Sequence, residues 1–369
     1  MLYKGINFMS YIKHLRNVST KLQELCRDSF ENIQHHYRSS FSNEFIYSLQ
    51  FLGTGQGTHN IASRGRQRLA NSRYVSGPII TTPKTAIWID PGPDCLEVVN
   101  HIDIDPRIIN SIFITHAHTD HVGNLICATE LITGATEIKK EKNLYGNNTT
   151  ILGGPDNPSF IDSFHSNTLL SQVQALYIGQ QIEYDDLVVT AIPSHHQETT
   201  SSNQSLNYKI TMYLNDNTIT ISHIDGNIFI PDSNGNPSDK IYSDIIESTL
   251  GSDILIVNVS NHVRMRTSKQ NYPSTTGLLK LIKSVQPSIT FTTHFGIEMM
   301  NLNFEALNLI QQLGMNNLIE FQAHYIQKEL DISNYKCRIF AAEDFMKAII
   351  NYDFLKIYSK NVYVDKVNL

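Results

Sequence analysis

The six-residue stretch HAHTDH, residues 116 to 121, contains four side chains that can bind a metal ion or carry a proton. They are His116, His118, Asp120 and His121. Imidazole and carboxylate together suit zinc, iron or manganese, whereas calcium and magnesium prefer oxygen ligands alone. Polar groups that enter a protein interior are costly unless something satisfies them. The cluster therefore predicts a transition-metal site.

The residues on either side predict where this site lies in the fold. SIFIT (Ser111–Thr115) is short, apolar and rich in β-forming residues, which predicts a buried strand. VGNLICATELIT (122–133) has apolar residues at helical spacing and predicts a helix. The cluster then occupies a turn at the carboxyl end of a strand, where α/β folds place their ligands.

Length and composition favour one large α/β domain. The chain has 369 residues, of which 41% are hydrophobic and 17% are charged, as in globular proteins. Its formal net charge of −6 argues against sequence-independent binding to nucleic acid or membranes, so any anion site must be local. The four cysteines form no C-x-x-C pair, and no apolar run approaches the roughly 18 residues of a membrane span. We expect a soluble protein of the reduced cytoplasm without a secretory signal.

Three regions are expected along the chain. Residues 1–43 have apolar positions at helical spacing and predict a helical N-terminal extension. Residues 44–335 form the main domain, which begins with the strand and Gly-rich turn of EFIYSLQFLGTGQG. Residues 336–369 form a tail that packs on this domain. The extension could cover the site, form the seam of a homodimer or cap a sheet.

Four further segments end an apolar strand in a residue that could bind a metal. They are IWIDPGP (87–93), VVTAIPSHHQE (188–198), TITISHIDGN (218–227) and SITFTTHFG (288–296). Together with HAHTDH, and in this order, they resemble the metallo-β-lactamase superfamily over about residues 46–325. The resemblance implies an αββα sandwich that holds one or two metals at the edges of its sheets.

The resemblance also implies a set of ligands for two divalent transition-metal ions. Zinc is favoured, with manganese and iron as alternatives. The first metal would be bound by His116, His118 and His196, the second by Asp120, His121 and His294, and Asp225 would bridge both. The chain reads HIDG where the family usually has Ser-Asp-Thr, which leaves the hydrogen-bond partners of Asp225 open. His223, two residues earlier, could substitute or only pack.

Two metals close together would acidify a shared water and stabilise charge on the oxygen under attack. Asp120 is the expected orienter of this nucleophile and a candidate proton carrier. Oxygen reduction by a diiron site is the less favoured alternative, because relatives with that chemistry typically carry Glu in place of His118.

A basic stretch after FLGTGQG indicates an anionic substrate. Residues 58–89 contain no Asp or Glu, but they contain Arg64, Arg66, Arg68, Arg73 and Lys84. Arginine side chains suit phosphate oxygens, and we single out Arg66 and Arg68 as substrate-binding residues. The pattern resembles the ribonuclease Z-like and phosphodiesterase branch of the superfamily. The alternative is that these side chains are solvated or pair with acids elsewhere.

A small phosphodiester, such as a cyclic nucleotide, is the favoured substrate. Only the short segment QETTSSNQSLN separates His196 from the next strand, whereas ribonuclease Z enzymes usually carry a long arm there. An acidic chain without that arm is poorly equipped to bind tRNA, so nucleic acid is not favoured. A lactonase or other acyl-ester hydrolase is the first alternative. A binding or regulatory module that keeps its metal for structure is the second.

Overall fold

The structure is a computed structural model, and it describes fourteen stretches of the chain. These are residues 15–25, 46–55, 73–99, 101, 106–133, 150–154, 172–194, 205–225, 239–259, 275–296, 299, 304–351, 354–359 and 362–369. Contacts divide the chain into two units, Met1–Phe45 and Ile46–Leu369. The described part of the first unit is a helix over residues 15–25. Among the described helices, none has the length and apolar character needed to cross a membrane.

The second unit is built on two β-sheets. In spatial order, the described strands of the first sheet are β16 (Val362–Asn368), β15 (Phe354–Ser359), β14 (Lys347–Ile350), β1 (Ser48–Gln50), β2 (Ile79–Thr81), β3 (Ala86–Ile89), β4 (Ser111–Ile114), β5 (Thr150–Gly153) and β6 (Gln172–Ala175). Those of the second sheet are β13 (Arg338–Ala341), β12 (Ile289–Thr293), β11 (Ile254–Asn258), β10 (Asn217–Ile224), β9 (Leu206–Leu214), β8 (Leu187–Pro193) and β7 (Gln181–Glu183).

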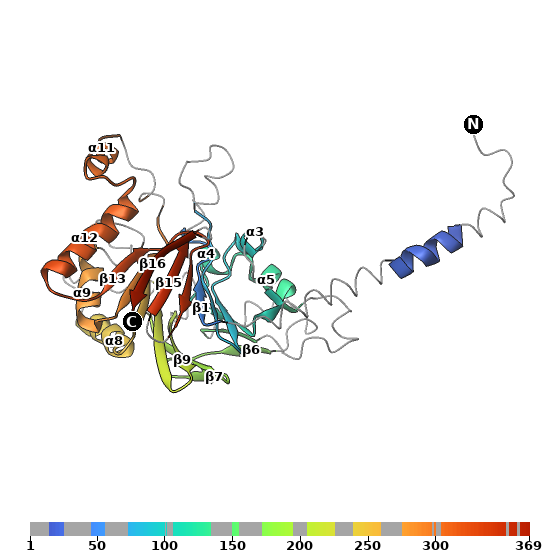
Figure 1. Ribbon diagram of the computed structural model, residues 1–369. Coiled ribbons are helices and arrows are strands. Elements are labelled where there is room, and N and C mark those ends of the chain that lie inside the picture. Colours follow the sequence, from blue (N-terminus) through green and yellow to red (C-terminus); the bar gives the residue numbers. More distant parts are fainter. Residues whose placement is uncertain are drawn as a thin grey trace. The chain divides into compact units, whose positions relative to one another are not determined.

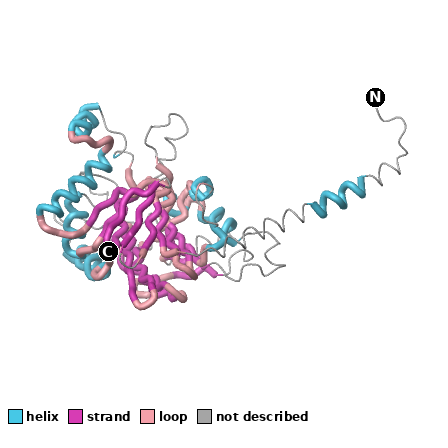
Figure 2. Tube along the Cα trace, viewed as in Figure 1, coloured by secondary structure: helices cyan, strands magenta, loops and turns pink. Residues whose placement is uncertain are grey.

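Helices cover the outer face of each sheet (Figures 1 and 2). On the first sheet, α3 (Cys95–Val99) and α5 (Leu125–Thr133) enclose a core around Trp88. On the second, α8 (Asp239–Thr249), α9 (Thr275–Val285) and α12 (Leu318–Ile332) enclose another core around Leu255. A third core lies between the sheets and includes Phe113, Tyr208 and Phe291. The expected αββα sandwich is therefore confirmed.

The hydrophobic pattern explains why the central strands occupy these places. Every residue of β4, β11 and β12 is buried, as expected for strands covered on both faces. β3 to β6 pair in parallel, and so do β10 to β13. Parallel strands bring their carboxyl ends to one edge of a sheet, which is where ligands bind in such folds. The topology thus brings the residues that follow β3, β4, β10 and β12 to the carboxyl-end edges of the two sheets.

Three further helices complete the described elements of this unit. They are the 3-10 helix η1 (Pro106–Ile108), α4 (Thr119–Val122) and α11 (Phe304–Gln312). The C-terminal residues belong to both sheets, because β13 pairs with β12 while β14 pairs with β1.

Candidate metal centre

The HAHTDH motif follows β4, and it spans the turn before α4, which carries His116 and His118, and the start of α4 itself. His116 follows β4 and is fully buried, and the first turn of α4 carries Asp120 and His121. Gly92 of the IDPGP turn packs against the backbone of this motif at Asp120. A Cβ at Gly92 would lie 2.5 Å from the Asp120 carbonyl oxygen and 2.4 Å from that of Val75, so only glycine fits. The two motifs therefore form one packed unit.

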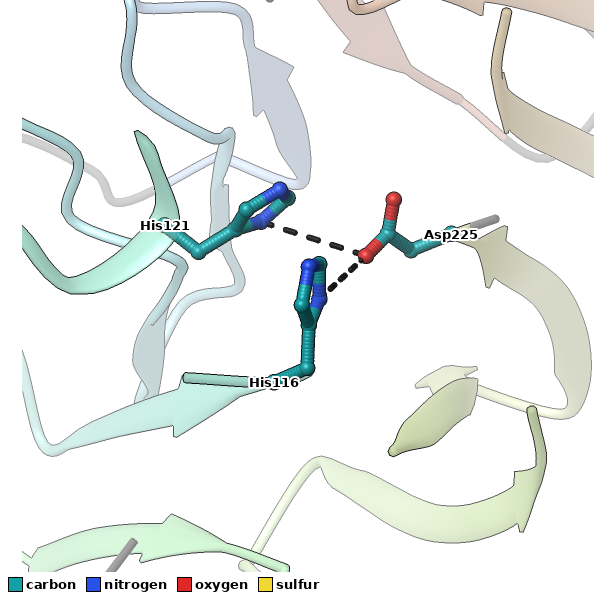
Figure 3. A group of neighbouring side chains, drawn as sticks. All are labelled: His116, His121 and Asp225. Atoms are coloured by element: carbon teal, nitrogen blue, oxygen red, sulfur yellow. Dashed lines mark ion pairs between the residues drawn. The ribbon is translucent and has the colours of Figure 1, made fainter. Parts of the chain in front are cut away.

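One group of candidate ligands joins the two sheets and consists of His116, His121 and Asp225 (Figure 3). Asp225 follows β10 of the second sheet, and both histidines come from the first-sheet side. The Nδ1 atom of His116 lies 2.7 Å from Asp225 Oδ2, and that of His121 lies 3.9 Å from the same oxygen. All three residues are buried.

A second group shares His121 with the first and adds Asp120 and His294. Asp120 Oδ2 lies 3.2 Å from His294 Nε2 and 3.7 Å from His121 Nε2. In each group the ligand atoms lie within 4.8 Å of one another. The buried Nε2 atom of His121 has no hydrogen-bond partner among the described residues. A buried nitrogen that faces a carboxylate and a second imidazole fits a bound transition metal, because the metal would satisfy it.

The remaining expected ligands are only partly described. His118 is half-buried, and its Nδ1 lies 2.8 Å from His116 Nε2, so these two ring nitrogens converge. His195 and His196 lie outside the described residues, which stop at Ser194 on this segment. Ser194 donates a hydrogen bond to the Asp225 carbonyl oxygen at 3.1 Å, so the described end of the segment lies beside the site.

Asp90 of the IDPGP motif supports His121 from behind. Its Oδ2 lies 2.8 Å from His121 Nδ1 and accepts a hydrogen bond from the Thr115 hydroxyl at 2.6 Å. Its Oδ1 accepts from the Thr115 backbone nitrogen at 2.8 Å. A carboxylate on the far nitrogen of a ligating histidine fixes the ring's orientation and tautomer. This arrangement directs His121 Nε2 toward Asp120 and His294.

Two buried asparagines orient Asp225, and the sequence patterns did not identify them. Asn258, at the end of β11, donates to Asp225 Oδ1 at 2.6 Å. Asn207, in β9, accepts from the Asp225 backbone nitrogen at 2.7 Å and donates to the Pro193 carbonyl oxygen at 2.8 Å. These bonds show which groups hold Asp225, a question that the HIDG sequence left open. The only signal in the sequence was the position of a polar residue in or beside a buried strand.

His223 belongs to neither group of candidate ligands. It is buried on β10, and this burial lowers its pKa. Its Nδ1 has no hydrogen-bond partner among the described residues.

The charges in the centre compensate one another. Burial by itself would raise the pKa of the Asp120 carboxyl, but His121 and His294 hold that pKa well below its usual range. Burial would likewise lower the pKa of His121, but three surrounding carboxylates, led by Asp225, raise it to about 10. Burial lowers the pKa of His118. Without a metal, therefore, a proton on His121 balances the acids, and a metal ion would replace it.

The basic stretch is described only in part, and its described members do not face the centre. Arg66 and Arg68 lie outside the described residues, as does Arg64. Arg73 donates to Thr54 Oγ1 at 2.7 Å and to the Ala342 carbonyl oxygen at 2.8 Å. Lys84 lies 3.6 Å from Asp185. Arg73 and Lys84 therefore pair with groups elsewhere in the chain, which is the alternative given for this stretch.

The comparisons with known proteins agree with this architecture. Residues 47–152 match the family model described as "Anti-Pycsar protein Apyc1". The metallo-beta-lactamase fold protein YhfI from Bacillus subtilis superposes with a TM-score of 0.54 at 11% identity, covering 83% of this chain and 99% of YhfI. This chain has the metallo-β-lactamase fold.

Two more relatives extend the comparison. The short form of human tRNase Z superposes with a TM-score of 0.53 at 14% identity, covering 82% of this chain and 99% of that one. The uncharacterized protein MJ1374 of Methanocaldococcus jannaschii is 24% identical over 268 residues, which are 72% of this chain and 89% of that protein. At these identities the structural likeness establishes the fold, and the chemistry must be argued from the site.

Proposed function

We propose that the protein is a metal-dependent hydrolase that cleaves a small phosphodiester. The observation that carries the proposal is the pair of buried ligand groups that share His121. A single tetrahedral site needs only four ligands, whereas this centre offers more than that. The first metal would be held by His116, His118 and His196, the second by Asp120, His121 and His294, with Asp225 between them. When bound, two such ions acidify a water and neutralise charge on the oxygen under attack.

The chain's own residues have separate tasks in this reaction. Asp120 stays ionised at neutral pH because its pKa is held low, so it can accept a hydrogen bond from the attacking water and orient it. Asn258 holds one oxygen of Asp225 at 2.6 Å and leaves the other directed toward His116. Asp90 fixes the His121 ring. This preorganisation keeps the site in the reactive geometry.

The choice of a phosphodiester rests on two supports. The stretch 58–89 has a basic excess, and Arg66 and Arg68 within it are the proposed contacts to phosphate. One neighbour of the same fold is a tRNase, so this architecture is compatible with cleavage of phosphodiesters. A small substrate, such as a cyclic nucleotide, is preferred to tRNA because the chain is acidic and lacks a long arm after His196.

The test compares substrate classes on the full chain reconstituted with zinc or manganese. Hydrolysis of an aryl phosphodiester and of a cyclic nucleotide should exceed hydrolysis of a simple lactone. Losing one charged contact should weaken kcat/KM for the phosphodiester about 10- to 150-fold in Arg66→Ala or Arg68→Ala. Lactone turnover should change less, because its ground state is neutral. Efficient lactone cleavage that ignores both substitutions would instead identify an acyl-ester hydrolase. Metal binding without turnover of either class would leave a structural or regulatory metal.

A further inference from the structure

A partly buried cluster is bonded to the residue that follows His294. Its acid is Asp344, in the C-terminal segment between β13 and β14. Asp344 Oδ1 accepts hydrogen bonds from Thr54, at 2.9 Å from the backbone nitrogen and 2.7 Å from the hydroxyl, and Oδ2 accepts from the Tyr74 backbone nitrogen at 2.9 Å. Arg73 donates to the same Thr54 hydroxyl at 2.7 Å.

This cluster is bonded directly to the residue that follows His294. The Phe295 backbone nitrogen donates to the Thr54 carbonyl oxygen at 2.7 Å, and Phe295 forms a parallel bridge with Gly55. The Arg73 guanidinium carbon lies 5.1 Å from the centre of the Phe295 ring. The chain around Phe295 is therefore held both through its backbone and through its side chain.

His294 needs such support because its backbone is strained. Its φ is 60°, in the left-handed region that a histidine adopts only at a cost. A strained residue persists when the surrounding structure determines its conformation from several sides. The contacts of Phe295 fix the backbone on the C-terminal side of His294, and β12 fixes it on the N-terminal side.

The same cluster closes the base of the chain between Thr54 and Arg73. Thr54 and Tyr74, which flank that segment, both donate to Asp344, and Gly55 donates to the Tyr74 carbonyl oxygen at 2.8 Å. The backbones of Gly53 and Tyr74 lie close together, since a Cβ on Gly53 would lie 2.4 Å from the Tyr74 carbonyl oxygen. The segment that carries Arg66 and Arg68 thus begins and ends at the acid that supports the His294 turn.

We propose that Asp344 and Arg73 are positioning residues that hold His294 in ligating geometry. The proposal gives Arg73, a member of the basic stretch, a role in supporting a metal ligand. It rests on the proposed function only in taking His294 as a ligand, and it requires no particular substrate. A carboxylate from the C-terminal segment then completes a centre whose ligands all come from earlier in the chain.

The test measures Zn²⁺ binding to the metal-stripped full chain, in competition with a chelating dye. In Asp344→Asn, an amide NH2 replaces Oδ2 and faces the Tyr74 N–H, so two donors oppose each other. Affinity for the Zn²⁺ that His294 would hold should fall roughly 10- to 100-fold, as is typical when a partner behind a ligand is lost. The other Zn²⁺ should bind as in wild type. His294→Ala gives the reference for a centre without this ligand, and Asp344→Asn should lower the affinity of the same Zn²⁺.

A second pair of variants separates positioning from general stability. Arg73→Met should lower the affinity for the same Zn²⁺. Arg73→Lys should keep much of that affinity, because a charged donor remains. The control is Asp331→Asn, the same chemical change at an exposed acid that lies 3.8 Å from Lys328. It should leave both Zn²⁺ ions unaffected. Wild-type binding of both ions in folded Asp344→Asn and Arg73→Met would overturn the proposal. Failure of both variants to fold would also overturn it, because the cluster would then be a requirement for folding.

Discussion

At the scale of single residues, His121 connects the two groups of candidate ligands. One ring nitrogen faces Asp90 at 2.8 Å, and the other faces Asp120 at 3.7 Å. In the metal-free protein the surrounding carboxylates, despite burial, raise its pKa from the ordinary 6.5 to about 10. Folding therefore favours the protonated ring.

The raised pKa predicts opposite effects of pH on stability and on metal binding. Because the folded pKa lies above the unfolded one, the stabilisation from His121 is complete below about pH 6.5 and is lost as pH rises through about 10. The Tm of the metal-free chain should fall across this window. Zn²⁺ affinity should rise across it, because binding must displace the proton.

Calorimetry in buffers of different ionisation enthalpy would measure the proton released per Zn²⁺ at about pH 7.5, inside the window where the ring is protonated. His121→Ala should lower the release by about one proton per chain and flatten the slope of Tm. If Zn²⁺ bound at this pH without releasing protons, the charge balance described for the centre would be wrong.

Replacing Asp120 with Asn should affect turnover far more than folding. The change removes an ionised ligand and the group that orients the attacking water. Losing such a proton-transfer group typically costs about 10²- to 10⁴-fold in kcat. The circular dichroism spectrum should stay close to wild type, and the Tm of the metal-free chain should fall because the carboxylate that balances His121 and His294 is lost. Near wild-type kcat on a substrate that the enzyme accepts would show that another residue orients the nucleophile.

The residues of the centre differ in how well the sequence could predict them. His116, His118, Asp120 and His121 are adjacent, so their spacing alone predicted a metal site, and the structure brings them together. Asp225 and His294 lie far along the chain from this motif and were assigned only through the resemblance to the metallo-β-lactamase superfamily. Asn207 and Asn258 could not be predicted, because a single asparagine in a buried strand has no spacing pattern. Its partners become adjacent only when the sheets pair.

At the scale of elements, β9 links segments that carry ligands in both sheets. The Leu206 backbone nitrogen donates to the Thr115 carbonyl oxygen at 2.8 Å, next to His116. The Tyr208 hydroxyl donates to the Ile114 carbonyl oxygen. Between them, Asn207 links the ends of β8 and β10. Through these bonds, β9 holds the carboxyl ends of β4, β8 and β10 together.

Asn207→Ala should therefore destabilise the protein and weaken its metal centre together. It leaves the Asp225 N–H and the Pro193 carbonyl oxygen without this partner, at about 1–3 kcal/mol for each buried group left unsatisfied. Urea unfolding of the metal-free chain would measure the loss, and Zn²⁺ titration would measure the effect on affinity. Asn316→Ala, at an exposed position, is the matched control. Unchanged stability in Asn207→Ala would mean that β9 does not link these strand ends.

The C-terminal residues show where local pattern misleads. The tail carries mixed helix and strand signals, and the sequence predicted only that it packs on the domain. In the described part of residues 336–369, every regular element is a strand. Pairing decides this, because β14 adds to β1 while Ala348 and Ile350 enter the core between the sheets. Such long-range pairing overrides local propensity and leaves no trace in a short sequence window.

At the scale of the whole molecule, the second unit holds its own core and its own candidate centre. The three buried clusters draw their members from residues 49–367, and both ligand groups lie within residues 116–294. Contacts place Met1–Phe45 in a separate unit, whose described part is the helix over residues 15–25. Isolated helices of that length are marginal in water.

Removing residues 1–45 should accordingly leave a folded protein that binds metal. We expect the shortened chain to match the full chain in Tm and in the number of Zn²⁺ ions bound, because the core residues that the structure describes and the candidate ligands all lie beyond residue 45. Its oligomeric state, measured by light scattering, tests the homodimer seam, one of the three roles open for the extension. A dimeric full chain and a monomeric shortened chain would assign it that role. A lower Tm at unchanged oligomeric state would instead show that the extension packs on the sheets of its own chain. A changed kcat/KM with unchanged Tm would place it over the site.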